Sequence, residues 1–438
     1  MIESSVPPQS PLLDRQTLYL RPDPSRVIVR PFKPATEPRD LNPTDKTRAN
    51  HIVERILALD APAAEAQLAD VLENFLGRHR NLLQTFESRA DDMEDAFEDH
   101  VQFTIVQRQL VGAYFLNEYS FEASALFNPS IVPHPDQSGL PHGSLRFILS
   151  LRAVGEGHIS SLTFRTGLIA DDGTVTIDPT ARLASTPLVR HLKSGPNGDD
   201  IEITFDRGQD ISERVIFPIT ASQSNGIEDA RFVKFGDGPN ATYYATYTAY
   251  SGRAIRSEMI ETSDFTTFRF SAFGGNAAQN KGMALFPRKI NGRFAMIARQ
   301  DNENLYLIYS DDLYTWNDGT AILTPAAPWE FVQIGNCGSP IELDEGWLLL
   351  THGVGPVRKY SIGAALLDKN DPAKILGRLR DPLLRPAPSE REGYVPNVVY
   401  TCGALRHRDK IIFPYAISDS YSNIATISIQ SLLQAIQP

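Results

Sequence analysis

Cysteine and long apolar runs are scarce in this sequence of 438 residues. Its two cysteines, Cys337 and Cys402, have neither the spacing of a zinc or iron–sulfur site nor the number that a disulfide framework needs. We therefore expect two buried thiols, a reducing compartment and no metal site. No uncharged apolar run approaches the ~20 residues that span a bilayer. The first ten residues lack the basic and apolar regions of a signal peptide, so we expect a cytoplasmic protein.

Positive charge is also in deficit. The chain has 42 Lys and Arg against 53 Asp and Glu, a formal net charge of −11. Such a protein does not generally attract phosphate backbones or anionic lipids, so neither nucleic-acid nor membrane partners are expected. A site for an anion would have to be built locally.

The first part of the chain is rich in proline and then in helical periodicity. Nine prolines fall within residues 1–43, which is typical of extended chain packed over another surface. From Thr44, a plausible N-cap, apolar residues recur at helical spacing, with Asp60 as a second cap. We expect one long helix from there to Phe86 and another over 90–116. Residues 1–126 are therefore predicted to form a proline-rich arm and a helical extension.

The rest of the chain, 127–438, has an all-β pattern of short β-branched and aromatic runs separated by turn residues. Five runs share one form, an apolar strand with a polar or aromatic end: 145–154, 243–251, 293–300, 346–354 and 410–418. Residues 262–268 align with 310–316, 48 residues later, a period close to that of one four-stranded propeller blade. These features predict a five-bladed β-propeller.

A first candidate for chemistry is the segment 226–231, Gly-Ile-Glu-Asp-Ala-Arg. In a propeller, polar residues at the ends of inner strands converge on a central channel. A carboxyl group such as Asp229 can be kept ionised by a neighbouring Arg or kept protonated by burial, which is how an acid catalyst is tuned. Ordinary surface ion pairing would also explain the segment.

A second candidate is a set of cations at the ends of three other strands: Lys281, Arg299, His352, Arg358 and Lys359. They could bind an oxyanion because the forked donors of Arg match phosphate oxygens. Ordinary ion pairs with Asp301 and Glu303 are the alternative. Asp419 ends the last predicted inner strand, where a structural turn role is equally expected.

Five motifs, taken together, resemble glycoside hydrolase family 130: residues 226–231, 284–287, 346–353, 360–372 and 393–403. They run in order over most of 127–438. The resemblance implies a five-bladed propeller that acts on β-mannosides, mostly by phosphorolysis to α-mannose 1-phosphate and in some members by hydrolysis. It implies no cofactor, with inorganic phosphate as co-substrate.

The resemblance also implies roles for single residues. Asp229 matches the general acid, and Arg299 and His352 match phosphate ligands. The positions that hold the transferred mannose match Asn128, Arg152 and Asp419, with Lys281 as a further candidate. One carboxylate is enough for a phosphorylase because phosphate is already an anionic nucleophile, which needs positioning and charge neutralisation rather than a base.

Several positions depart from the family pattern. No Arg follows Trp316, where phosphorylases carry a further phosphate ligand, so Arg358 or Lys359 would have to substitute. Ala230 replaces a usual Pro, and Gln333 stands where some members have Lys.

Two other functions therefore stay open. An inverting β-mannosidase would use Asp229 as acid and Asp301 or Glu303 as base. A non-catalytic glycan-binding propeller is the third hypothesis. The amphipathic helices, by resemblance to related enzymes with such extensions, predict a homo-oligomer.

Overall fold

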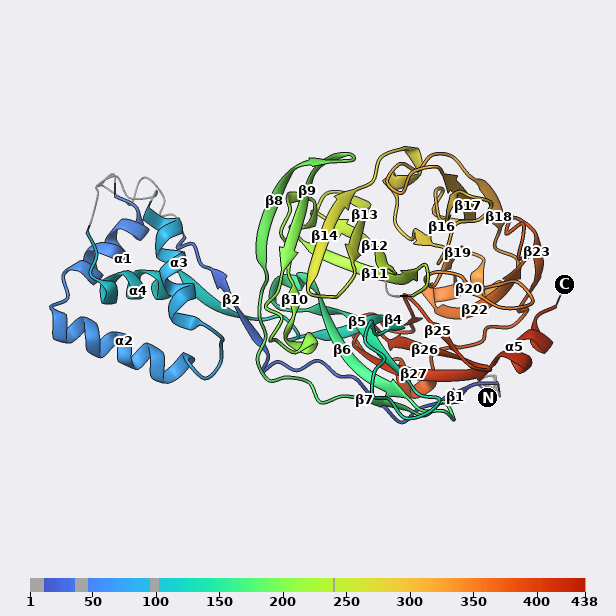
Figure 1. Ribbon diagram of the computed structural model, residues 1–438, viewed down its shortest axis with the longest axis horizontal. Coiled ribbons are helices and arrows are strands. Elements are labelled where there is room, and N and C mark those ends of the chain that lie inside the picture. The colour runs from blue at the N-terminus through green and yellow to red at the C-terminus, as the bar shows by residue number, and fades with distance from the viewer. Residues whose placement is uncertain (1–11, 36–45, 95–101, 239–240, 438) are drawn as a thin grey trace. The chain divides into compact units, whose positions relative to one another are not determined.

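The computed structural model describes residues 12–35, 46–94, 102–238 and 241–437 (Figure 1). The chain divides into two compact units. The first, here called the β unit, consists of Met1–Asp23, Glu122–Ala181 and Thr186–Pro438, and the second, the helical unit, consists of Pro24–Phe121 and Arg182–Ser185. Each is described by itself below. No helix in the described ranges is long and apolar enough to cross a membrane.

The helical unit contains four helices and a two-stranded antiparallel sheet within the described residues. The helices are α1 (Arg48–Leu57), α2 (Ala61–Phe75), α3 (Leu82–Glu94) and α4 (Ile105–Tyr114), and the strands are β2 (Val27–Pro31) and β3 (Leu116–Ser120). As expected, Asp60 caps α2 and accepts a hydrogen bond from the Ala63 amide. The cap of α1 is Thr47, whereas the expected cap Thr44 lies outside the described residues.

The predicted long helices are each divided in two. The first is broken between Phe75 and Leu82, where Asn81 has a left-handed backbone (φ 51°) that no helix continues through. The second is divided into α3 and α4, with 95–101 outside the described residues. The four helices share one apolar core that includes Val53, Leu68 and Leu110.

The β unit is mostly strand, and its sheets follow one another around a common centre in Figure 1. The largest has the order β4 (Ala125–Pro133), β5 (Leu145–Val154), β6 (Ser160–Ile169), β11 (Gly226–Phe235), β12 (Thr242–Tyr250), β13 (Ile255–Thr262), β14 (Thr267–Ala272), β9 (Gly198–Thr204) and β8 (Leu188–Gly195), with β7 (Val175–Ile177) and β10 (Val215–Ile216) on β6. A single parallel pair, Gly226 with Ser160, joins β11 to β6.

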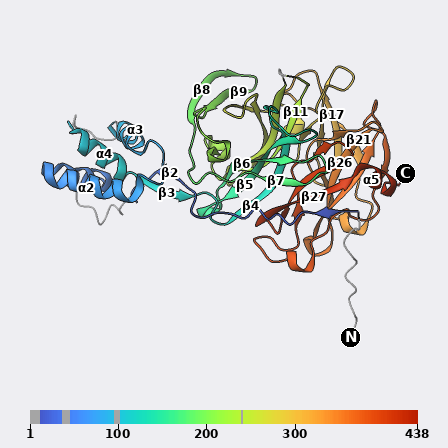
Figure 2. The same cartoon turned by 60° about the horizontal axis from the view of Figure 1, so that its bottom comes forward.

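Three smaller sheets complete the described part of the β unit. One is β15 (Ala284–Leu285), β16 (Phe294–Ala298), β17 (Leu305–Ser310) and β18 (Thr320–Leu323). The next is β19 (Gln333–Asn336), β21 (Trp347–Val354), β22 (Tyr360–Leu367) and β23 (Ile375–Arg378), with β20 (Ile341–Glu342) on β21. The last is β1 (Asp14–Arg15), β27 (Tyr421–Ser428), β26 (Lys410–Ile417) and β24 (Val399–Tyr400), with β25 (Leu405–His407) on β26. The short helix α5 (Ile429–Ala435) follows β27 near the C-terminus (Figure 2).

The strand predictions are confirmed: the five apolar runs are β5, β12, β16, β21 and β26. The internal repeat is one turn built twice. The Thr262 and Ser310 hydroxyls each donate across their turn to a carbonyl five residues later, and the side chains of Asp264 and Asp312 each accept two backbone amides. The repeat therefore records local turn chemistry, between β13 and β14 in one sheet and between β17 and β18 in another.

Candidate active site

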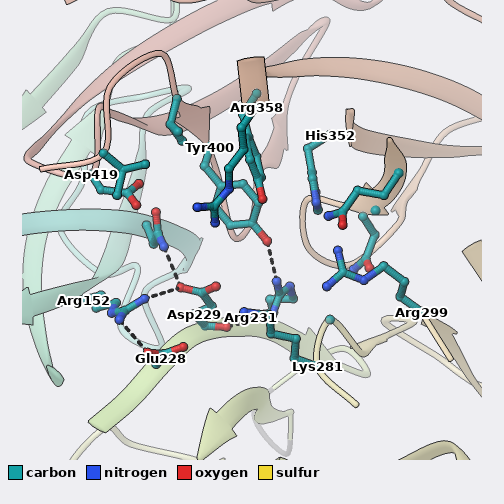
Figure 3. A pocket seen from close by; sticks show the side chains of 18 residues that line it. Arg152, Glu228, Asp229, Arg231, Lys281, Arg299, His352, Arg358, Tyr400 and Asp419 are labelled. Carbon is teal, nitrogen blue, oxygen red and sulfur yellow. Dashed lines mark hydrogen bonds and ion pairs between the residues drawn. The ribbon is translucent and has the colours of Figure 1, made fainter. Parts of the chain in front are cut away.

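One pocket of the β unit collects most of the residues that the sequence singled out for chemistry (Figure 3). Its volume is about 210 Å³, and side chains at strand ends and in the following turns line it. The predicted residues in its lining are Asn128, Arg152, Asp229, Lys281, Arg299, His352, Arg358 and Asp419. Asp301, Glu303 and Lys359 are not part of the lining. Lys359 instead lines a second cavity, beside Trp329 and Arg385.

Two β-bulges place the central residues. The register of β4 against β5 shifts between Phe127 and Ser130, and that of β11 against β12 shifts between Glu228 and Arg231. Asn128 and Asp229 lie inside these bulges with left-handed backbones (φ 48° and 52°). Asn and Asp tolerate this conformation better than other residues with a Cβ, and a bulge re-aims a side chain that regular pleating would fix. The Asn128 amide donates to Asp229 Oδ1 over 2.6 Å as a result.

Asp229 is surrounded by cations (Figure 3). Arg152 bridges two carboxylates, with its Nη1 3.4 Å from Asp229 and its Nη2 2.7 Å from Glu228. Burial alone would raise the pKa of Asp229, but the charges of Arg152, Arg231 and Lys281 and the hydrogen bond from Asn128 outweigh it and lower the pKa below its usual value. Asp229 is therefore ionised when the pocket holds no ligand.

Arg231 and Tyr400 join Asp229 to His352. The Arg231 guanidinium donates to the Asp229 carbonyl over 3.0 Å and to the Tyr400 hydroxyl over 2.6 Å. The Tyr400 ring meets the His352 ring edge-on, with centroids 4.9 Å apart, and the Tyr360 ring stacks on it at 5.8 Å. His352 thus packs against two aromatic rings. Burial, together with Arg299 and Arg231, lowers the pKa of His352 well below its usual value, so its ring is neutral.

Arg299 supplies a buried positive charge in the pocket. Arg299 is only 8% exposed, and its Nε has no hydrogen-bond partner among the described residues. Burial lowers the pKa of its guanidinium. A buried cation that lacks a full set of partners is costly unless an anion completes the site, so this part of the pocket is suited to an oxyanion.

Arg358 and Asp419 reach the pocket from turns. Both have left-handed backbones (φ 53° and 49°), a strain that is typical of binding sites. Arg358 lies over the Tyr360 ring at 6.0 Å. Burial raises the pKa of Asp419 to about 6, with Arg152 opposing this shift and Asp229 adding to it. Asp419 can therefore hold a proton close to neutral pH.

Asp301, one of the two carboxylates proposed as an alternative base, has a structural role. Asp301 accepts hydrogen bonds from the backbone amides of Glu303 and Asn304, from the Asn304 side chain and from Tyr306. Burial opposes these hydrogen bonds, but together they outweigh it and lower the pKa of Asp301 to about 2. A carboxylate with so low a pKa is a weak base, and it lies outside the pocket lining.

Sequence reasoning did not assign a role to several lining residues, among them Tyr360, Tyr400, Asn336, Gln333 and Glu228. Tyr360, Tyr400 and Glu228 lie within the family-like motifs, which were the available signal. Asn336 comes close to His352 only through the pairing of β19 with β21, which the sequence does not display.

Both cysteines are buried, as expected. Burial raises the pKa of the Cys337 thiol to about 12, and its Sγ lies 3.9 Å from His352 Nδ1. No group of three or more metal-ligating side chains occurs among the residues that the structure describes.

Comparisons with known proteins point to the same family as the motifs described above. A family model described as beta-1,4-mannooligosaccharide phosphorylase, glycoside hydrolase family 130, matches residues 197–437. The Listeria innocua beta-1,2-mannobiose phosphorylase is 32% identical over 231 residues, which are 51% of this chain and 63% of that protein. A 1,2-beta-oligomannan phosphorylase of Thermoanaerobacter sp. is 34% identical over 217 residues, 49% of this chain and 72% of that protein.

Solved structures show the same fold. The Listeria innocua enzyme in complex with beta-1,2-mannobiose superposes with a TM-score of 0.52 at 22% identity, over 72% of this chain and 92% of that one. A member of the same family described among glycoside hydrolases that target beta-1,2 mannosidic linkages in Candida mannan superposes with a TM-score of 0.53 at 18% identity, over 72% of this chain and 87% of that one. Because the family model covers more than half of the chain, the protein belongs to glycoside hydrolase family 130.

Proposed function

We propose that the protein is an inverting β-mannoside phosphorylase, which converts a β-mannoside and phosphate into α-mannose 1-phosphate and a shortened acceptor. The observation that carries this proposal is the pocket itself: it sets Asp229 beside Arg299 and His352, while Asp301 and Glu303 lie outside its lining. Relatives named as mannoside phosphorylases support the same activity.

In this proposal Asp229 is the general acid. The charges of Arg152, Arg231 and Lys281 lower its pKa, so Asp229 is ionised before phosphate binds. A phosphate anion held at Arg299 and Arg358 brings negative charge into the same pocket, so the pKa of Asp229 rises when phosphate binds. The proton is then present when the glycosidic oxygen leaves, and general acid catalysis of this kind contributes ~10²–10⁴-fold in rate.

Phosphate would be held by Arg299 and His352, with Arg358 in place of the Arg that is missing after Trp316. Arg299 provides charge in a buried site, where it is worth more than in water. His352 is neutral, so it donates one hydrogen bond without repelling the guanidinium groups beside it. The phosphate oxygen attacks the anomeric carbon as the bond to the acceptor oxygen breaks, and the configuration inverts.

The mannose that is transferred would be bound by Asn128, Arg152, Lys281 and Asp419. These side chains surround Asp229 in the pocket lining. Polar side chains that are fixed in place hold a sugar ring in one orientation. This converts a bimolecular encounter into a nearly unimolecular reaction.

The proposal is tested by phosphate dependence. Purified protein should release α-mannose 1-phosphate from β-1,2- or β-1,4-mannobiose only with phosphate present, and Asp229→Asn should lose at least ~10²-fold in rate. Asp301→Asn is the matched control and should keep its activity. Equal release of free mannose with and without phosphate would instead identify a β-mannosidase, and no turnover of any mannoside would leave a glycan-binding protein.

We further propose that residues 127–438 form a five-bladed β-propeller as the catalytic domain, with 1–126 as an extension. The succession of sheets around one centre supports this arrangement.

The helical unit exposes large apolar side chains, among them Leu76 and Tyr114, which supports a homo-oligomer. Sedimentation of the full chain and of Leu76→Glu tests that, since a single charge in the interface should dissociate it. A cytoplasmic location is a proposal that cell fractionation would test.

A further inference from the structure

Two turns of the β unit have the same construction. One follows β5, residues 154–159 (Val-Gly-Glu-Gly-His-Ile), and the other follows β21, residues 354–359 (Val-Gly-Pro-Val-Arg-Lys). The Gly155 amide donates to the Ile159 carbonyl over 3.3 Å, and the Gly355 amide donates to the Lys359 carbonyl over 3.0 Å. Both turns end in two residues with left-handed backbones: 157 and 158 (φ 67° and 59°), and 357 and 358 (φ 54° and 53°).

This equivalence locates His158. It occupies the position in its turn that Arg358 occupies in the other, and Arg358 lines the pocket. His158 also lies two residues before Ser160, whose hydroxyl accepts a hydrogen bond of 2.9 Å from the Arg152 guanidinium. Its turn is therefore fixed to the residue that bridges Glu228 and Asp229. His158 is outside the pocket lining itself, and from these two links we place its turn at the rim of the pocket.

Tyr394 reaches the same rim from another segment. Its amide donates to the Ser420 hydroxyl over 2.9 Å, and the next amide, that of Val395, donates to the Ser418 carbonyl over 3.1 Å. These bonds fix the segment on either side of Asp419, and Val395 itself lines the pocket. The Tyr394 and His158 rings face each other with centroids 5.3 Å apart at 30°.

This aromatic pair has no packing role that would explain it. Tyr394 is 55% exposed and His158 is exposed as well. Neither ring belongs to an apolar core cluster of the described residues, although Val395 does. An exposed pair of rings held on two anchored segments at the mouth of a polar pocket is typical of a binding surface, because aromatic rings offer large contact area at low entropic cost.

We infer that Tyr394 and His158 form a further binding subsite, which stacks on a neutral sugar ring of the leaving oligosaccharide outside the pocket. The inference rests on the proposed function: the transferred mannose lies deep beside Asp229, so the acceptor chain must leave across the rim. The axial C–H groups of a pyranose present an apolar face that fits an aromatic ring. The subsite would favour chains longer than a disaccharide.

The test compares substrate lengths at saturating phosphate. For Tyr394→Ala we expect kcat/KM to fall about tenfold with β-1,2-mannotetraose, the effect of losing one good aromatic contact, and to stay near wild type with β-1,2-mannobiose. His158→Gly, which keeps the left-handed backbone and removes the ring, should act in the same direction. Tyr394→Phe should behave as wild type, and Tyr19→Ala in the same unit is the control for an exposed tyrosine. The KM for phosphate should not change.

Calorimetric titration with mannotetraose in the absence of phosphate separates this inference from the proposed function. Weaker binding by Tyr394→Ala than by wild type supports the subsite even if no phosphorolysis is found. Wild-type binding and turnover of mannotetraose by both Tyr394→Ala and His158→Gly would overturn it. So would equal losses for mannobiose and mannotetraose, because the pair would then shape the pocket instead of binding a distal sugar.

Discussion

Asp229 and Asp419 lie in one pocket, yet their carboxyl groups are shifted in opposite directions. The pKa of Asp229 is lowered by the charges of nearby cations and by a hydrogen bond from Asn128, which together outweigh its burial. The cations are Arg152, Arg231 and Lys281. Burial dominates for Asp419 and raises its pKa to about 6. Two carboxyl groups with such different pKa values can hold different protonation states at the same pH, so they can have different roles in one site.

The raised pKa of Asp419 makes a prediction about stability. The folded state holds this proton up to about pH 6, whereas the unfolded carboxyl releases it near 3.8. The contribution of Asp419 to stability is therefore fully present below about pH 4 and is lost as the pH rises through 6, by up to ~3 kcal/mol. Asp419→Asn should raise the melting temperature at pH 8 and change it little at pH 4, while activity falls.

Thermal denaturation of wild type and Asp419→Asn between pH 4 and 8 measures this difference. Asp344→Asn, at an exposed carboxylate, is the control and should follow the wild-type curve. Parallel curves for wild type and Asp419→Asn would show that Asp419 does not titrate with a raised pKa.

Arg299 gives the second prediction at this scale. A bound phosphate at 100 times its Kd should stabilise the wild-type protein by ~2.7 kcal/mol. Arg299→Met should lose this phosphate-dependent stabilisation and should lower kcat/KM for phosphate by ~10²–10³-fold. Because the substitution also removes a buried cation, the variant without phosphate should be at least as stable as wild type.

Melting temperatures with and without phosphate test this. Arg293→Met, at an exposed arginine paired with Asp311, is the control. An unchanged response to phosphate in Arg299→Met would remove Arg299 from the phosphate site.

At the scale of elements, the bulges in β4 and β11 decide where the site can form. A regular strand would direct alternate side chains to opposite faces, and Asn128 and Asp229 could not then both take the left-handed geometry that joins them. The fold thus accepts backbone strain at two strands in order to position one hydrogen bond.

The Asn128 bulge can be tested with two substitutions. Asn128→Gly keeps the left-handed backbone and removes the amide that donates to Asp229, whereas Asn128→Ala also adds a strain of ~1–2 kcal/mol. Both variants should lose activity. Only Asn128→Ala should show a clearly lower free energy of unfolding, measured by urea denaturation, and equal stability of the two would contradict the strain.

At the scale of the whole molecule, the two units should respond separately to damage. Gly112 on α4 faces the backbone of α3 so closely that an added Cβ would lie 1.9 Å from the Phe86 carbonyl oxygen. Gly112→Ala should therefore force the helices apart and destabilise the helical unit by ~1–3 kcal/mol. If 127–438 is the catalytic domain, the activity of each folded β unit should be kept.

Hydrogen exchange followed by mass spectrometry, with activity assays on the same samples, measures both effects. Gly77→Ala is the matched control in the same unit, because an added Cβ there meets nothing within 4 Å. Loss of protection across the β unit in Gly112→Ala, or the same effect from Gly77→Ala, would contradict independent units.

The sequence by itself determined the strands and the identity of the candidate site residues. Short apolar runs rich in β-branched and aromatic residues form strands, and 145–154 became β5 with the predicted bounds. It misjudged the helices because helical spacing persists through Asn81, where the backbone turns left-handed. Tertiary structure alone decided that Tyr400 packs against His352 and that His158 meets Tyr394. Those contacts join residues far apart in the chain, and only the arrangement of the sheets brings them within range.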